Sequence, residues 1–371
     1  MSSKPRILVT SAAGRTGAPA VLQLLEGGFP VRAFVRRRDA RSRALEAAGA
    51  EIFVGDLFNL RDLRHALEDV QRAFHCPPFA PNLLHGSLLF ALAAEEAKLE
   101  TVALLSEWNP HPSHPSVVTR EHWIANNVFR WMPSVDVIHV NPGLFAFMYL
   151  LGLPVLQHLG LLVLPYGEGL NAPPSNEDIG AVAAGVLADP ADHIGKCYRP
   201  TGPKLISCED VAEILARVLG RRVRYRDVPT SMFVKAARAQ GLKTFEIAQI
   251  RHFAEEMRRG VFAVSAPTDH VERITRRPPE DFETIARRYL AQPELIAPGL
   301  SAGSKLGALM FMARMMLTPV GDLDRWERER GHPMIAGSEL AVDNPEWLAA
   351  AERGQLALLD PNPDSEIHAR T

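Results

Sequence analysis

Apolar residues in the first 140 positions alternate between short β-branched runs and longer segments with apolar positions three or four residues apart. The short runs predict buried strands, and the longer spacing predicts amphipathic helices. The predicted strands are Arg6–Thr10, Val31–Val35, Glu51–Val54, Arg72–Cys76, Thr101–Leu105 and Asp136–Val140, and the predicted helices are Gly17–Glu26, Arg41–Ala48, Leu60–Leu67, Leu83–Ala97 and Thr119–Trp131. Strands that alternate with helices in this way predict an α/β fold with a doubly wound parallel sheet.

After Gly143 the pattern loosens and proline becomes frequent, which predicts that a smaller α/β lobe begins there. Ser207-Cys-Glu-Asp210 has the form of a capping box and predicts a helix that ends at Leu219, before Gly220. A strand at Val223–Asp227 and helices at Ser231–Gln240, Phe245–Arg258 and Pro279–Leu290 are expected to follow, the last opened by its proline. The predicted division is a first domain over 1–145, a smaller lobe over 146–292 and a helical C-terminal extension over 293–371.

Two apolar segments need a separate interpretation. Leu144–Tyr166 carries no acidic or basic charge apart from one histidine, but it contains glycine and proline and follows a predicted strand. We therefore expect a buried or ligand-lining segment there rather than a membrane span. The Met-rich segment Leu306–Leu317 is expected to be a helix packed on the main body, with a lid, a homodimer contact or an apolar ligand surface as alternatives.

Composition narrows the classes of protein. The chain has 371 residues, of which 47% are hydrophobic and 23% charged, with a net charge of -2, and this balance is typical of a soluble globular protein rather than a general nucleic-acid binder. Cys76, Cys197 and Cys208 are far apart and follow no metal-ligand spacing, so neither a disulfide framework nor a metal site is predicted. The N-terminus lacks a signal-peptide core, and we expect a cytoplasmic protein.

The segment Ile7-Leu-Val-Thr-Ser-Ala-Ala-Gly-Arg-Thr-Gly17 is a predicted strand, a glycine-containing turn and a helix start. Such a turn lets main-chain N–H groups and the positive helix end approach a pyrophosphate. The candidate cofactor-binding residues here are Thr10, Ser11, Gly14, Arg15, Thr16 and Gly17. The alternative is a strand–helix turn without a ligand, but its place on the first strand of a βα series favours a dinucleotide site.

The end of the second strand carries Arg36-Arg37-Arg38, where an NAD-binding protein would have an acidic residue. Guanidinium groups at this position would attract a 2′-phosphate, which favours NADP(H) over NAD(H). Because 34 of the 41 basic residues are arginine, a solvated basic run is the alternative. Asp56, after the third strand, is a candidate for the adenine amino group, or else an ordinary turn residue.

From Arg6 to about Leu290 the chain resembles the NmrA-like proteins, an atypical branch of the short-chain dehydrogenase/reductase superfamily. The motifs that carry the resemblance are Val9-Thr-Ser-Ala-Ala-Gly-Arg-Thr-Gly17, Val35-Arg-Arg-Arg38, Gly55-Asp-Leu57, Thr119-Arg-Glu-His-Trp123 and Asn141-Pro-Gly-Leu-Phe145. The family pattern departs at Ser11, which stands where a glycine is usual. The resemblance implies a Rossmann domain that binds NADP(H) and a smaller lobe that closes over a substrate cleft.

Ordinary members of that superfamily use a Tyr-x-x-x-Lys pair for proton transfer, and none of the five tyrosines here has a lysine four residues later. The corresponding place holds Ser116-Val-Val-Thr-Arg120, so the resemblance implies that Arg120 grips the nicotinamide ribose. A guanidinium cannot act as an acid. His114 and His122 are the candidate proton donors, with a structural role as the alternative for each.

The resemblance also gives roles to the remaining candidate site residues, which follow strands of the predicted sheet. Ser106, after the fifth strand, would steady a carbonyl oxygen or else be a plain loop hydroxyl, and Cys76 would border the cofactor channel. Asn141, Pro142 and Gly143 would flank the nicotinamide. The candidate substrate pocket, with core packing as its alternative, comprises Phe145, Phe147, Met148 and Tyr149.

These features lead to three functional hypotheses. The first is an NADP(H)-dependent oxidoreductase that transfers hydride to a small, fairly apolar substrate. The second is a non-catalytic protein that binds NADP(H) and reports its redox state to a partner, which the missing Tyr-Lys pair favours. The third, an isomerase or lyase that uses the same pocket, stays open.

Overall fold

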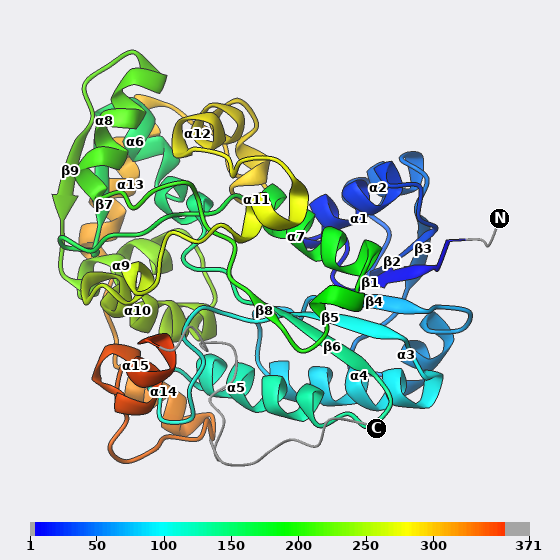
Figure 1. Ribbon diagram of the computed structural model, residues 1–371. Coiled ribbons are helices and arrows are strands. Elements are labelled where there is room, and N and C mark those ends of the chain that lie inside the picture. The colour runs from blue at the N-terminus through cyan, green and yellow to red at the C-terminus, as the bar shows by residue number, and fades with distance from the viewer. Residues whose placement is uncertain (1–3, 353–371) are drawn as a thin grey trace.

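The structure is a computed structural model, and it describes residues 4–352. Seven parallel strands form one sheet in the order β3-β2-β1-β4-β5-β6-β8 (Figure 1). Its strands are β1 (Ile7–Val9), β2 (Val31–Val35), β3 (Glu51–Val54), β4 (Arg72–His75), β5 (Thr101–Leu105), β6 (Asp136–Val140) and β8 (Cys197–Tyr198). The doubly wound parallel sheet expected from the sequence is confirmed, with the reversal of strand order between β1 and β4.

Helices cover both faces of this sheet. One face carries α1 (Gly17–Glu26), α2 (Ala40–Ala47) and α7 (Asn176–Ala188), and the other carries α3 (Leu60–Ala66), α4 (Leu83–Ala97) and α5 (Val117–Arg130). Alternate residues of one strand serve opposite faces, so that Ile7 and Val9 pack toward α1 while Leu8 packs toward α4. The near-continuous apolar strands in the sequence follow from this burial on both faces.

Two elements from the second half of the sequence complete the sheet layer. Strand β8 pairs with β6, joining His139 to Cys197 and Val140 to Tyr198, and α7 packs along α1. Helix α11 (His270–Thr275) packs against α7 from the outside, and Val271 joins the same core. Residues 176–198 therefore belong to the first layer in space, although the sequence division at 145 assigns them to the smaller lobe.

The smaller lobe is built around a two-stranded parallel sheet, β7 (Leu161–Leu164) with β9 (Arg224–Asp227). Its helices are α6 (Leu153–Leu159), α8 (Cys208–Leu219), α9 (Thr230–Ala239), α10 (Thr244–Arg258) and α12 (Phe282–Ala291), and its 3-10 turns are η1 (Ala146–Leu150), η3 (Val261–Ala263) and η4 (Pro293–Leu295). Tyr149, Tyr289 and Leu215 lie in its buried core. The 3-10 turn η2 (Ala191–His193) connects α7 to β8 in the first layer. The uncharged segment 144–166 forms η1, α6 and β7. No helix among residues 4–352 is both long enough and apolar enough to cross a membrane.

Local sequence signals set several helix boundaries. The capping box at α8 is confirmed: Ser207 Oγ accepts from the Asp210 N–H at 3.1 Å, and Asp210 Oδ2 accepts from the Ser207 N–H at 2.8 Å. The expectation that Pro279 opens a helix is wrong. Helix α12 begins at Phe282 because the Asp281 carboxylate caps it, accepting the Thr284 N–H at 2.7 Å.

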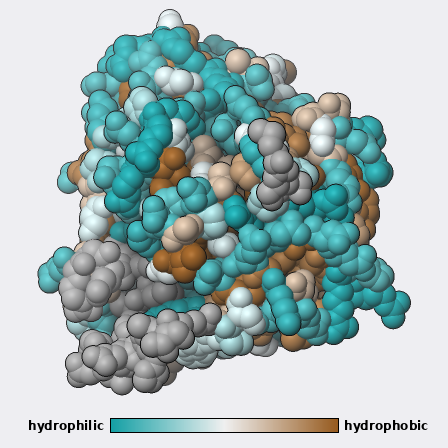
Figure 2. All heavy atoms as spheres, turned by 45° about the vertical axis from the view of Figure 1, so that its right-hand side comes forward, coloured by the Kyte–Doolittle hydropathy of each residue, from teal (hydrophilic) through white to brown (hydrophobic). Residues whose placement is uncertain are grey.

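The C-terminal extension contains α13 (Lys305–Leu317), α14 (Leu323–Glu329), η5 (Ala341–Asp343) and α15 (Pro345–Glu352). Residues 353–371, which the sequence analysis also assigns to this extension, lie outside the described part of the chain. Trp347 and Ala341, both fully buried, join the core of the smaller lobe. Helix α13 packs on α6 and α9 but leaves apolar side chains exposed, among them Leu306, Met310 and Leu317. The face of the molecule drawn in Figure 2 is mainly hydrophilic, with smaller hydrophobic patches.

Candidate functional site

The turn between β1 and α1 is held close by its glycines. The Gly14 N–H donates to the Ser11 carbonyl at 2.8 Å, and a Cβ on Gly17 would lie 2.5 Å from the same oxygen. Ser11 occupies the position of the usual first glycine and takes the left-handed φ of 48° that glycine adopts without strain. The turn therefore keeps the backbone shape of a pyrophosphate loop despite the departure at Ser11.

The side chains of this turn bind to other parts of the molecule. Thr10 Oγ1 accepts from the Cys76 N–H at 2.8 Å, which ties β1 to β4. Thr16 Oγ1 donates to Asn176 Oδ1 at 3.3 Å. Arg15 donates to the Ile296 carbonyl at 3.0 Å and lies over the Phe147 ring at 4.2 Å. Arg15 thus connects the turn to the C-terminal part of the chain.

The predicted 2′-phosphate contact follows β2. Arg36 and Arg37 are exposed, and the Arg37 guanidinium comes only within 3.9 Å of Asp39. Arg38 instead pairs with Glu46 at 2.8 Å. The structure therefore leaves the first two arginines available for a phosphate group, while the third is already paired.

The turn after β3 and the residue after β4 have structural partners. Asp56 Oδ1 accepts from the Phe58 N–H at 3.0 Å, so this exposed aspartate also shapes its own turn. Cys76 is buried, and burial raises the pKa of its thiol to about 12. Its thiol stays protonated, so a reactive cysteine at the channel is not supported.

The carboxyl ends of β5 and β6 present buried polar atoms without a partner. Among the described residues, Ser106 Oγ and both amide atoms of Asn141 make no hydrogen bond, and Asn141 is fully buried. The strands are adjacent, with Leu105 beside Val140 and the Ser106 N–H donating to the Val140 carbonyl at 2.9 Å. A buried polar group without a hydrogen bond costs about 1–3 kcal/mol, so this edge is suited to a polar ligand.

The loop between β5 and α5 places the predicted catalytic residues. Arg120 donates to the carbonyl oxygens of His114, at 2.5 Å, and Pro115, at 3.1 Å, and also to that of Pro333 in the extension. Its guanidinium thus fastens the loop to the extension. Ser116 Oγ, at the α5 N-cap, donates to Gln249 on α10 at 2.9 Å.

The predicted histidines do not gather around one point. Burial lowers the pKa of His122 to about 4, and its imidazole is close enough to His75 for their charges to interact. His114 is directed instead toward α10, where its Nε2 lies 2.8 Å from Glu256 Oε1. Burial lowers the pKa of His114 to about 3, with the charge of Arg120 as a further cause.

The four predicted pocket residues separate into two groups. Phe145 and Phe147 contact each other edge to face, with ring centres 5.8 Å apart, beside Arg15. Met148 and Tyr149 line an apolar cavity of about 80 Å³ between α6, β7, α9 and α13. Small-molecule sites ordinarily measure roughly 300–1,000 Å³, so this cavity admits a substrate only if its walls move.

Comparison with known proteins finds similar sequences and similar folds. The sequence pattern of the NmrA-like family matches residues 3–123, about a third of the chain, so this part of the chain is similar to that family.

Several similar proteins align with this chain over most of their own length. An NAD(P)H azoreductase of Xenophilus azovorans is 28% identical over 292 residues, which span 77% of this chain and 98% of that protein. The solved triphenylmethane reductase of a Citrobacter species, complexed with NADP(H), has a TM-score of 0.66 at 19% identity and covers 76% of this chain and 99% of that one. The negative transcriptional regulator NmrA, complexed with NADP, has a TM-score of 0.64 at 19% identity, with 81% and 99% covered. The two structures support the fold.

Several residues near the candidate site escaped the sequence analysis. Burial raises the pKa of Glu107 to about 8, and its Oε1 has no hydrogen-bond partner within residues 4–352. Arg199 lies 3.2 Å from the ring centre of Trp108 and donates to its carbonyl. Trp108 packs against Gly143, where a Cβ would lie 3.4 Å from Trp108 Cε3. Glu107 directly follows the candidate residue Ser106, so its place in the sequence could have marked it. Nothing in the sequence indicated that Trp108 contacts Arg199, which is 91 residues away.

Proposed function

We propose that this chain is an NADP(H)-dependent oxidoreductase that transfers hydride to a small, fairly apolar substrate. The observation that carries the proposal is a pair of buried polar groups at the ends of adjacent strands, Ser106 Oγ and the Asn141 amide, which have no partner in the part of the chain that the structure describes. They stand on the same edge of the sheet as the glycine turn after β1. A dinucleotide lies along this edge in a doubly wound sheet.

The residues present fit a dinucleotide phosphate. The close-packed turn at Gly14 and Gly17 would hold the pyrophosphate at the N-terminus of α1, and Arg36 and Arg37 would bind the 2′-phosphate. Ser106 and Asn141 would orient the nicotinamide end. When bound, the nicotinamide supplies the hydride, and the chain orients it and shields it from water.

The relatives support a reduction reaction. The azoreductase named above uses NAD(P)H according to its name, and its similarity spans nearly its whole length. The apolar character of the substrate rests on Phe145 and Phe147, which follow directly from the β6 end, and on the apolar cavity beside Met148. These supports leave the individual substrate open.

The alternative is a protein that binds NADP(H) and reports its state without turnover. Arg120, the expected ribose contact, is bound to three carbonyl oxygens, and the Tyr-x-x-x-Lys pair is missing. A transcriptional regulator of similar fold binds NADP. These observations favour a purely structural role for Arg120, so the contact expected between Arg120 and the nicotinamide ribose would be missing.

Cofactor binding and turnover are measured separately. Protein fluorescence follows titration with NADPH and with NADH, and NADPH absorbance is then followed with a panel of quinones, azo dyes, enones, imines and aldehydes. We expect tighter binding of NADPH and its oxidation by at least one apolar acceptor. Binding without oxidation across the panel supports the sensing alternative, and absence of binding contradicts both.

The three arginines after β2 provide a matched set of variants. Arg36→Ala combined with Arg37→Ala should weaken NADPH binding and leave NADH binding nearly unchanged, since only NADPH carries the 2′-phosphate. Arg38→Ala should change neither, because Arg38 pairs with Glu46. Equal effects of the double and single variants on NADPH would move the phosphate contact elsewhere.

A further inference from the structure

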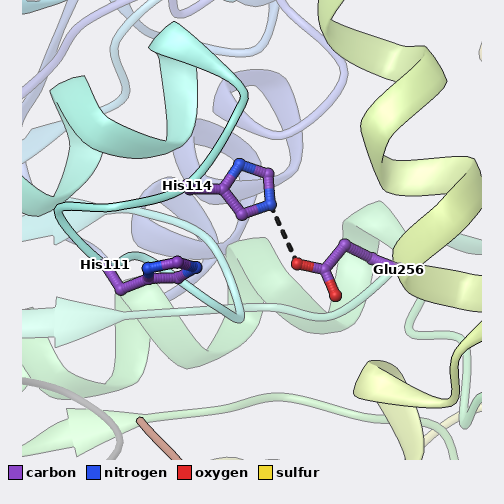
Figure 3. A group of neighbouring side chains, drawn as sticks. All are labelled: His111, His114 and Glu256. Atoms are coloured by element: carbon purple, nitrogen blue, oxygen red, sulfur yellow. Dashed lines mark hydrogen bonds and ion pairs between the residues drawn. The ribbon is translucent and has the colours of Figure 1, made fainter. Parts of the chain in front are cut away.

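A cluster of metal-ligating side chains lies where the β5–α5 loop meets α10. His111 and His114 come from the loop and Glu256 from the helix, and one ligand atom from each lies within 4.8 Å of the others (Figure 3). All three side chains are fully buried. The sequence analysis predicted no metal site, because its search was based on cysteine spacing and Glu256 is 142 residues from His114.

The cluster has unused binding capacity. Both ring nitrogens of His111 and the Oε2 atom of Glu256 have no hydrogen-bond partner among the described residues. Polar atoms are rarely left alone in an interior, because water has been removed without a replacement. An ion that accepts lone pairs from nitrogen and oxygen would satisfy these atoms together.

The surroundings hold the carboxylate in position. Glu256 Oε1 accepts from the Asn109 side-chain amide at 2.9 Å and from the Ala341 main-chain N–H at 3.0 Å. His114 Nε2 also lies on this oxygen, so three donors share Oε1 and leave Oε2 for a ligand. Outer contacts of this kind orient the ligands of protein metal sites.

Coordination of an ion by His114 would require a change in the hydrogen bonds of its imidazole. The Ser116 N–H donates to His114 Nδ1 at 2.9 Å, so in the ion-free form the imidazole proton is on Nε2 and faces Glu256. Coordination through Nε2 moves that proton to Nδ1, and the Ser116 contact must then break. The hydrogen bond from Nε2 to Glu256 is lost as well, and these two hydrogen bonds are small beside the free energy of forming a zinc site, so the exchange is favourable.

We propose that His111, His114 and Glu256 bind one Zn²⁺ ion. Two imidazoles and a carboxylate form a donor set that zinc accepts, with a fourth tetrahedral position for water. Because Ala341 contacts Glu256, the ion would fasten the β5–α5 loop to α10 and to the extension at one point. This proposal is independent of the proposed oxidoreductase function.

The test uses the full chain without nucleotide. Protein dialysed against a chelator is titrated with ZnCl₂, and bound zinc is measured by elemental analysis and calorimetry. We expect one zinc per chain and a rise in the thermal midpoint on binding. Co²⁺ in place of zinc should give the visible absorption of a four-coordinate ion. No stoichiometric binding overturns the proposal.

Variants locate the ion. His111→Ala and Glu256→Gln should abolish stoichiometric binding, and Asn109→Ala should weaken it by about 10–100-fold through loss of an outer contact. The exposed His65→Ala is the control and should bind zinc normally. Circular dichroism establishes that each variant is folded. His111 is the safest of the three to replace, since its ring makes no hydrogen bond to any described residue. Zinc retained at full affinity by folded His111→Ala contradicts the assignment.

Discussion

The two ends of the candidate cofactor edge are built in different ways. At the β1–α1 end, Ser11, Gly14 and Gly17 contact one another within seven residues of chain. At the β5–α5 end, Arg120 reaches Pro333, and Glu256 meets both His114 and Ala341. The first end depends on local backbone geometry, whereas the second is assembled from three distant parts of the chain.

This contrast gives the C-terminal extension a structural role at the second end. It supplies carbonyl and N–H groups to the β5–α5 loop and its neighbour α10, and it contributes Trp347 to the core of the smaller lobe. Nearly a quarter of this chain has no counterpart in the azoreductase alignment. We expect the second end to depend on long-range packing and the first end to depend on the space around its glycines.

The largest effect is expected from Trp347→Ala. Trp347 is fully buried, and removing a buried tryptophan side chain costs about 3–5 kcal/mol in free energy of unfolding. The control is Trp131→Ala, whose side chain is 70% exposed and whose loss should change stability by about 0.5 kcal/mol or less. Denaturant unfolding compares the two. Similar small losses for both would mean that the extension does not stabilise the lobe.

Gly17→Ala tests the first end. The new Cβ would lie 2.5 Å from the Ser11 carbonyl oxygen and 2.9 Å from Ala12 Cα, and backbone atoms cannot easily retreat. We expect a loss of about 1–3 kcal/mol in free energy of unfolding, with weaker NADPH binding. Gly152→Ala is the matched control, since nothing lies within 4 Å of its Cβ position and its φ is -83°. Equal stability of the two variants would show that the turn is not tightly packed.

Acid should affect the second end more than the first, because the buried histidines lie in the β4–β6 half of the sheet. Burial lowers the pKa of His75 to about 3 and those of His122 and His139 to about 4. The unfolded chain therefore binds more protons than the folded chain below pH 6.5, so stability is full above that pH and is lost as the pH falls toward 4.

Each such histidine contributes up to about 1.4 kcal/mol per pH unit to this slope. His139→Leu should remove one such contribution, since burial keeps its imidazole mainly neutral in the folded state at pH 5–6 and its ring nitrogens have no hydrogen-bond partner among residues 4–352. Chemical unfolding at several pH values measures the slope for His139→Leu and for the unaltered protein, and equal slopes would contradict the assignment.

The smallest effect is expected from Ser11→Gly. A serine with a φ of 48° is strained by about 1–2 kcal/mol, and glycine removes this strain while raising the entropy of the unfolded chain. We expect a net gain of about 0.5 kcal/mol, measured as a higher thermal midpoint. Ser207→Gly, at a φ of -85°, is the control and should lose stability slightly because it removes a helix cap. A loss in both variants would show that Ser11 is not strained.

The sheet was predictable because its signals are local. The bounds of β2, β3, β5, β6, α1 and α4 agree with the sequence prediction, since each element has its own apolar pattern and ends at turn residues. Strand β8 was missed because two residues carry too little pattern, and they reach β6 only through α7. Helix α7 was missed in a region where frequent proline suggested irregular structure.

The candidate site also has one part that local sequence signals predicted and one part that they did not. The glycine turn and the arginines after β2 were recognisable from spacing alone, and cofactor binding by them stays a prediction. The environment of Arg120 was not recognisable, because Pro333 is 213 residues away, and the same is true of Glu256 beside His114. Spacing along the chain contains no information on such contacts.

The sequence by itself determined the parallel sheet, the tight turn at Gly14 and Gly17, and the positive charge after β2, because each depends on residues within one turn or one βα unit. Only the tertiary structure decided that Arg120 binds carbonyl groups and that Met148 and Phe147 face different surroundings. It also decided that the extension completes the lobe around His111 and Glu256. The reason is physical: burial and partner choice depend on which distant segments share the interior, and packing brings those segments together only in the folded chain.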